Sequence, residues 1–250
     1  MFKHKVKLAL TFLTLVAMTG CSGLPKQQAY NQQANTHVKK VAIVKPITPE
    51  EVNIYYHNHP GYQAGLIGGI AAGIEFTSKT NGYNEAIANQ SFNPSEYLVE
   101  SLQKALEDRN YDVSLIETSA TESRKFMQEY PKKGIDAVLD NYFYSYGYTA
   151  GSPIAAYKPT IKLQTRLVDS NSEAVLYANQ LATGENFGLR DNTRYIGHSE
   201  NFSFPSYDAL KESPESSIDG LKDAINRIVS SIVQELAPIE KEPKSIALNN

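Results

Sequence analysis

Near the end of the chain, apolar residues recur at the spacing of an α-helix, and this pattern constrains the fold more than any other feature. The stripe consists of Ile218, Leu221, Ile225, Ile228, Val229, Ile232 and Leu236. Lys222, Asp223 and Arg227 lie off the stripe, Ser213-Pro214-Glu215 supplies a helix start, and Pro238 ends the pattern. A helix with one apolar side has to bury that side against another element. We therefore expect a second layer built from upstream residues.

Five upstream runs have the composition of β-strands, namely residues 39–47, 111–116, 137–148, 160–169 and 174–183. The polar turn at 170–172 indicates an antiparallel hairpin between the last two. Asn93-Pro94 begins a helix with Leu98, Leu102 and Leu106 on one side, and residues 122–130 are expected to form a short helix. The fold predicted is one α/β (α+β) domain. Its mixed five-stranded sheet follows the order β-α-β-α-β-β-β-α, with amphipathic helices on the sheet.

The amino terminus has the pattern of a secretory signal peptide. Lys3, Lys5 and Lys7 precede an uncharged stretch, residues 8–22, which is shorter than the roughly 20 residues that cross a bilayer as a helix. Cys21 is the only cysteine and follows the small residue Gly20. We expect cleavage to remove residues 1–20.

This junction resembles the lipobox of bacterial lipoproteins, with Met18 where that family usually has leucine. The resemblance implies a diacylglycerol on the Cys21 thiol and an acyl chain on its new amino group, with no other cofactor. Ser22 after the cysteine implies the outer membrane rather than the inner one. The expected location is therefore the outer membrane, with a lipid-anchored domain that faces the periplasm.

Composition narrows the possible functions. Cleavage reduces 24 basic residues to 21 against 27 acidic ones, so the formal charge changes from −3 to −6. A mildly acidic chain without basic clusters is a poor candidate for binding nucleic acid. Residues 21–37 are polar and are expected to form a flexible linker, residues 38–238 the domain, and residues 239–250 a disordered tail.

Two segments resemble periplasmic lipoprotein domains of the curli-secretion type, the activator lipoproteins of penicillin-binding proteins, and the amino-terminal domain of TolB. The first is Lys133-Gly134-Ile135-Asp136-Ala137-Val138-Leu139, a turn into a strand. The second combines Leu163-Gln164-Thr165-Arg166-Leu167-Val168-Asp169 with Glu173-Ala174-Val175-Leu176-Tyr177. The resemblance implies a related α/β fold and, less specifically, a subunit of an envelope secretion complex.

A glycine-rich apolar insertion at residues 60–76 departs from that family pattern. Gly61, Gly65, Gly69 and Gly73 recur every four residues, which on a helix would allow another backbone to approach closely. Three interpretations stay open: a helix that packs on another copy or a protein partner, a segment that dips into the membrane, and a helix or loop folded on its own domain. A phosphate-binding loop is disfavoured, because no Lys-Ser/Thr follows.

Tyrosines alternate along residues 137–148 and suggest one aromatic face. Tyr142, Tyr144, Tyr146 and Tyr148 would share this face, which could bind a partner, stack on glycan rings or be covered within the domain. His57 and His59 lack further ligands nearby, so exposed loop histidines are favoured over a metal site.

No catalytic motif is present, so the sequence predicts neither catalytic nor metal-ligating residues. The favoured function is a non-enzymatic, lipid-anchored envelope protein that binds a protein partner or assembles with itself. A transport subunit and a glycan- or lipid-binding module are the alternatives, and any small-molecule ligand is unknown.

Overall fold

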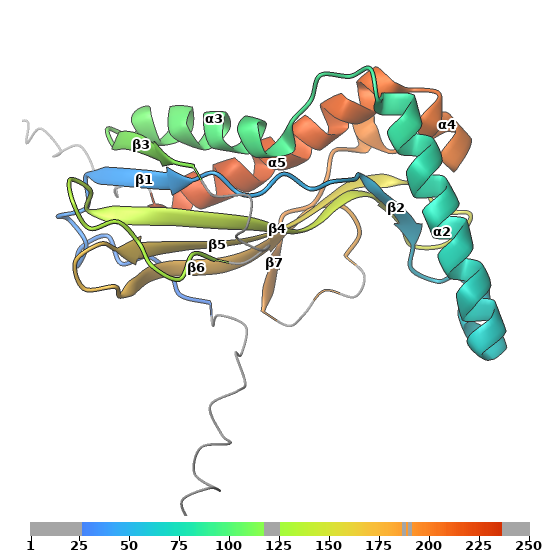
Figure 1. Cartoon of the computed structure of the whole chain (residues 1–250), viewed down its shortest axis with the longest axis horizontal. Coiled ribbons are helices and arrows are strands. Elements are labelled where there is room, and N and C mark those ends of the chain that lie inside the picture. The colour runs from blue at the N-terminus through green and yellow to red at the C-terminus, as the bar shows by residue number, and fades with distance from the viewer. Residues whose placement is uncertain (1–26, 118–125, 187–188, 190–191, 237–250) are drawn as a thin grey trace, which may run out of the picture.

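The computed structural model describes residues 27–117, 126–186, 189 and 192–236 (Figure 1). The predicted signal peptide, Cys21 and the tail at 239–250 lie outside the described residues. The strands are β1 (Lys40–Val44), β2 (Asn53–Tyr56), β3 (Asp112–Ile116), β4 (Ala137–Ala150), β5 (Lys158–Asp169), β6 (Val175–Ala182) and β7 (Thr193–Tyr195). The helices are η1 (Pro60–Ala64), α2 (Gly65–Ile87), α3 (Pro94–Glu107), η2 (Glu200–Phe202), α4 (Tyr207–Lys211) and α5 (Pro214–Leu236).

The predicted α/β class is confirmed, but the described sheet has seven strands rather than five. Its order is β3-β1-β4-β5-β6-β7, and β2 pairs with the far end of β4. The β4–β5 and β5–β6 pairs are antiparallel, whereas β1, β2, β3 and β7 each join a neighbour in parallel. The two strands missed from the sequence, β2 and β7, have four and three residues and are too short to show a periodic pattern.

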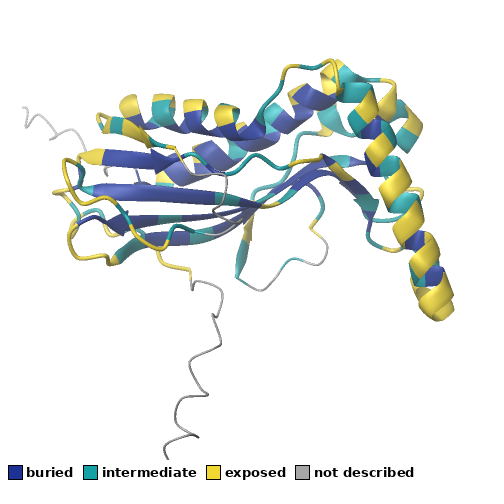
Figure 2. Cartoon of the chain, in the orientation of Figure 1, coloured by how far each residue is buried: buried dark blue, intermediate teal, exposed yellow. Residues whose placement is uncertain are grey.

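Helices α3 and α5 lie together along one face of the sheet (Figure 1), and their apolar sides are buried there (Figure 2). Both helices were predicted from their periodicity. The Asn93 side chain caps α3 by accepting hydrogen bonds from the backbone N–H groups of Ser95 (3.0 Å) and Glu96 (3.1 Å). The main core therefore lies between this helical layer and the sheet.

The β5–β6 hairpin forms at the predicted turn, and Asp169 organises it. Its Oδ1 accepts hydrogen bonds from the backbone N–H groups of Asn171 (3.0 Å) and Ser172 (2.8 Å), and from the Ser172 hydroxyl (2.9 Å). His37 Nε2 lies 2.9 Å from the other carboxylate oxygen. These hydrogen bonds lower the pKa of Asp169 to about 2, and the bond from the Ser172 backbone N–H contributes most.

The short helix predicted at residues 122–130 is wrong where it can be checked. Residues 126–130 are not helical, and residues 122–125 lie outside the described part of the chain. The backbone N–H of Met127 donates to Asp140 Oδ2 (2.8 Å), and Arg166 donates to the Met127 carbonyl (2.8 Å). Because Asp140 is buried, its carboxylate needs donors such as the Met127 N–H. These tertiary contacts override the local preference for a helix.

The flexible linker predicted for residues 21–37 is wrong from residue 27 onward. The Gln28 backbone forms an isolated antiparallel bridge with Ala178, and Gln27 Nε2 donates to the Asn192 carbonyl (2.8 Å). Tyr30 packs against the main core. Gln27 and Gln28, whose side chains are typical of a linker, instead form hydrogen bonds with the edge of the sheet. The described part of the domain therefore begins before residue 38.

Candidate interaction surfaces

Helix α2 carries the glycine-rich segment, and its first half projects beyond the sheet (Figure 1). We call residues 60–74, which comprise η1 and the start of α2, the arm. In the rest of α2, Thr80 and Tyr83 are buried, and the Tyr83 hydroxyl lies 2.6 Å from Ser217 Oγ on α5. The helix therefore has a packed half and a projecting half.

The arm exposes large aliphatic side chains to solvent, as the yellow tip of α2 in Figure 2 shows. The exposed fractions are 82% for Leu66, 83% for Ile67, 56% for Ile70 and 67% for Ile74. No charged residue occurs within residues 60–74. Contiguous exposed apolar side chains of this kind mark contact surfaces.

A cluster of polar and aromatic side chains fastens the base of the arm to β2. Tyr56 stacks on His59 with ring centroids 5.1 Å apart, and Phe76 meets the Tyr56 ring edge-on at 5.0 Å. Glu75 accepts hydrogen bonds from the Tyr56 hydroxyl (3.1 Å) and His59 Nε2 (3.0 Å), and pairs with Lys79 (2.8 Å). The bond from Lys79, followed by those from His59 and Tyr56, holds the pKa of Glu75 at about 2. The arm is thus held at a defined angle.

His59 has a structural role, so the prediction of exposed loop histidines is wrong for this residue. Its side chain is only 9% exposed. Nδ1 accepts the Gly61 N–H (2.9 Å), which caps η1 and leaves the proton on Nε2 to face Glu75. Within the described ranges, no group of three His, Cys, Asp or Glu side chains could hold a metal ion.

The four-residue glycine ladder does not run along one helix. Gly61 lies in η1, and Gly65, with φ 63°, forms the joint between η1 and α2. Gly68, which was not among the predicted site residues, contacts Gly61 and closes the η1–α2 hairpin. Gly65, Gly69 and Gly73 leave open space where a side chain would stand, but the positive φ of Gly65 disfavours any side chain there. The predicted stripe is therefore split, because two of its glycines are needed to turn the chain.

The predicted single tyrosine face is also wrong, because a β-bulge between Phe143 and Ser145 shifts the register of β4 against β5. Beyond the bulge, Tyr146 (3% exposed) and Tyr148 (0%) point into the main core. Tyr146 therefore cannot be a contact residue. Tyr144 (56% exposed) faces outward and Tyr142 is partly buried.

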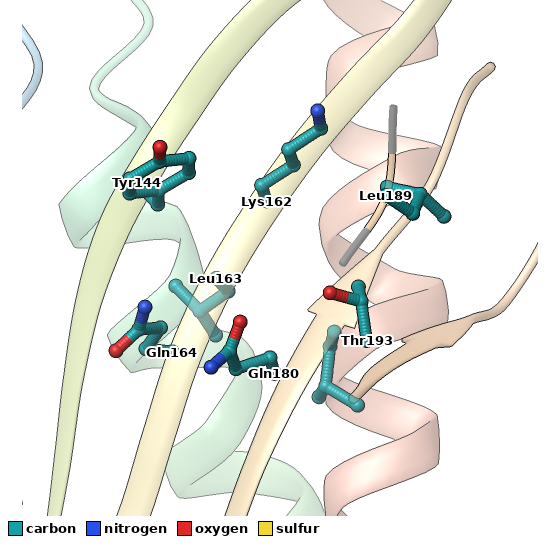
Figure 3. A pocket seen from close by; sticks show the side chains of 8 residues that line it. Tyr144, Lys162, Leu163, Gln164, Gln180, Leu189 and Thr193 are labelled. Atoms are coloured by element: carbon teal, nitrogen blue, oxygen red, sulfur yellow. The ribbon is translucent and has the colours of Figure 1, made fainter. Parts of the chain in front are cut away.

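Tyr144 lines a pocket on the sheet face opposite α3 and α5, which we call the sheet pocket (Figure 3). Its volume is about 110 Å³, and Lys162 and Gln164 of β5, Gln180 of β6, Thr193 of β7 and Leu189 contribute to its lining. Sequence reasoning missed these residues. The local signal is limited to Lys162 and Gln164 at alternate positions of one strand and Gln180 on the next strand.

No helix in the described ranges is long and apolar enough to cross a membrane.

Comparisons with known proteins assign no family. No protein-family model matches the chain, and no curated protein matches it. Solved structures with a related arrangement include protein XCC0632 from Xanthomonas campestris, with 12% identity, a TM-score of 0.40, and coverage of 78% of this chain and 82% of that one. The PelC dodecamer from Paraburkholderia phytofirmans shares 15% identity at a TM-score of 0.28, over 81% of this chain and 94% of that one.

Lipoprotein GNA1162 from Neisseria meningitidis also shares 15% identity, at a TM-score of 0.26, over 61% of this chain and 86% of that one. At these scores the likenesses concern the general α/β arrangement and carry no argument about a function.

Proposed function

We propose that this protein is a non-enzymatic envelope protein, anchored to the outer membrane through Cys21 with its domain in the periplasm, that associates with copies of itself through the arm. The observation that carries the proposal is the exposure of Leu66, Ile67, Ile70 and Ile74 on a segment held away from its own domain. Because the domain does not cover this apolar surface, burying it against another surface would be favourable.

The energy available from the arm is moderate. Burying one Leu or Ile side chain fully contributes about 1.5–3 kcal/mol. Four side chains that are 56–83% exposed therefore offer roughly 4–9 kcal/mol. Association costs about 4 kcal/mol or more in lost freedom. A lipid anchor would raise the local concentration of the arms, so assembly is expected on the membrane rather than in dilute solution.

The shape of α2 supports a helix as the occupant. A shallow groove runs along Ile70, Gly73, Ile74 and Thr77 toward the packed half of the helix. Gly73 leaves open space at this groove, so a second helix can approach the backbone there. The same element of a second copy has matching aliphatic side chains.

Oxidative crosslinking in isolated envelopes tests self-association. Lipidation would leave the chain without a free thiol, so a single introduced cysteine reports on its own position. Ile70→Cys is expected to give a disulfide-linked dimer. Ile154→Cys, at a residue that is 94% exposed on the β4–β5 connection, is the matched control and is expected to stay monomeric. Equal dimer yields from both variants would contradict the proposal.

A second candidate function for the arm is insertion into the bilayer surface. The arm is uncharged, and its tip points to the same side of the sheet as residues 27–37, the start of the described chain, in Figure 1. An inserted arm would protect Ile70→Cys from water-soluble thiol reagents without forming dimers. Ile154→Cys would react in either case.

A further inference from the structure

The sheet pocket lies on other elements than the arm and has the features of a binding site. Gln164 pairs across the sheet with Gln180, and Gln180 with Thr193, so three strands bring polar side chains into one row. In Figure 3, Tyr144 and Leu189 lie on either side of Lys162, above this row. A volume of about 110 Å³ has room for several water-sized groups.

Lys162 brings a positive charge to the sheet pocket. It forms no ion pair with the described residues, although it is partly buried. Lys158, four residues earlier on the same strand, pairs with Glu185 at 3.1 Å. Burial lowers the pKa of Lys162, because the ammonium group loses part of its contact with water.

The side-chain amide of Gln180 supplies a second hydrogen-bond donor to the pocket. Gln180 is only 7% exposed, and its Nε2 has no hydrogen-bond partner within the described part of the chain. Buried polar groups normally have partners, and an unpaired one is costly. Within the described residues, an ammonium without an ion pair and an amide without an acceptor line the same pocket, so a ligand that supplies acceptors would suit both.

We propose that the sheet pocket binds the carboxylate of a small polar ligand, with Lys162 and Gln180 as donors and with Tyr144 and Leu189 as walls for its carbon atoms. A carboxylate offers two acceptor oxygens and a negative charge, which match an ammonium and an amide. Tyr144 is 56% exposed and presents a ring face or edge that suits the carbon skeleton of a sugar or a peptide terminus.

Titration calorimetry of the purified full chain in detergent tests this with two matched pairs of probes. Glucuronate is compared with glucose, and N-acetyl-alanine with its amide, so that each pair differs mainly in the carboxylate. At least one acid is expected to bind about tenfold more tightly than its neutral counterpart, and the pair that responds distinguishes a sugar acid from a peptide terminus. If neither acid binds in the millimolar range, or each acid binds no better than its neutral counterpart, the proposal is wrong.

Variants place the binding at the pocket. Lys162→Gln is expected to abolish the preference for the acid, Lys162→Arg to keep it, and Lys158→Gln, the matched control beside Glu185, to keep it as well. Lys162→Met should also raise the melting temperature, since it removes a partly buried charge that forms no ion pair with the described residues. A folded Lys162→Gln protein that keeps its preference for the acid would overturn the assignment.

Discussion

Gly68 and Gly69 are adjacent on α2, yet substitution by alanine is expected to have opposite effects on the arm. A Cβ at Gly68 would lie 2.7 Å from the Ala64 Cβ and would overlap the Gly61 carbonyl oxygen. At Gly69 a Cβ would meet nothing within 4 Å. The two variants therefore share the same chemistry and differ in the space available.

The magnitudes follow from these contacts. Alanine is favoured over glycine inside a helix by about 1 kcal/mol, so Gly69→Ala should slow local opening of the arm about fivefold. Overpacking costs about 1–3 kcal/mol, so Gly68→Ala should lose up to about 2 kcal/mol after the same helix gain. That loss corresponds to local opening up to about 30-fold faster.

Hydrogen exchange followed by mass spectrometry on peptides that cover residues 57–75 measures both effects. The Tyr62 N–H, which donates to the His59 carbonyl (3.0 Å), reports on η1 directly. Exchange should become faster in Gly68→Ala and slower in Gly69→Ala, while peptides from α5 stay unchanged. If Gly68→Ala slows exchange as Gly69→Ala does, the close approach of η1 to α2 is not present in solution.

Three further predictions concern the elements that position the arm and the hairpin. The pKa of Glu75 is lowered to about 2 from its usual 4.5, so its stabilising contribution is complete above about pH 4.5 and is lost as the pH falls toward 2. Hydrogen exchange in the arm should therefore accelerate over that pH range in the native chain, and much less in Glu75→Gln. Asp169→Ala should destabilise the protein by about 1–3 kcal/mol in urea unfolding, and Asp169→Asn, which keeps one acceptor, by less. Gly147 has φ 151°, and a Cβ there would overlap the Asn53 backbone. Gly147→Ala should therefore weaken the β2–β4 pairing and speed hydrogen exchange in the arm. Unchanged exchange in β2 would contradict this.

Local patterns were read correctly where a few neighbouring residues decide the structure. Asn93-Pro94 begins α3 because an amide side chain and a proline suit the first turn wherever the helix packs. The stripe from Ile218 to Leu236 predicts α5, because its periodicity defines which side of the helix is buried. The five longer strands were also identified from the sequence.

The candidate sites were harder to predict, because they depend on pairings between distant residues. The register shift at Phe143 and Ser145 arises where β4 meets β5, and it turns Tyr146 inward while Tyr144 stays outside. Lys162, Gln180 and Thr193 become neighbours only through strand pairing. No spacing along the chain indicates that they share a pocket.

The sequence by itself determined the uncharged glycine-rich segment, the capped amphipathic helices and the hairpin turn, because these depend on contacts within a few residues. Only the tertiary structure decided that Gly61 and Gly68 close a hairpin, that β2 and Glu75 hold it, and that Leu66 and Ile67 face solvent. The physical reason is that the burial of a residue depends on which other parts of the chain pack against it. For residues 60–74, the domain itself provides little cover.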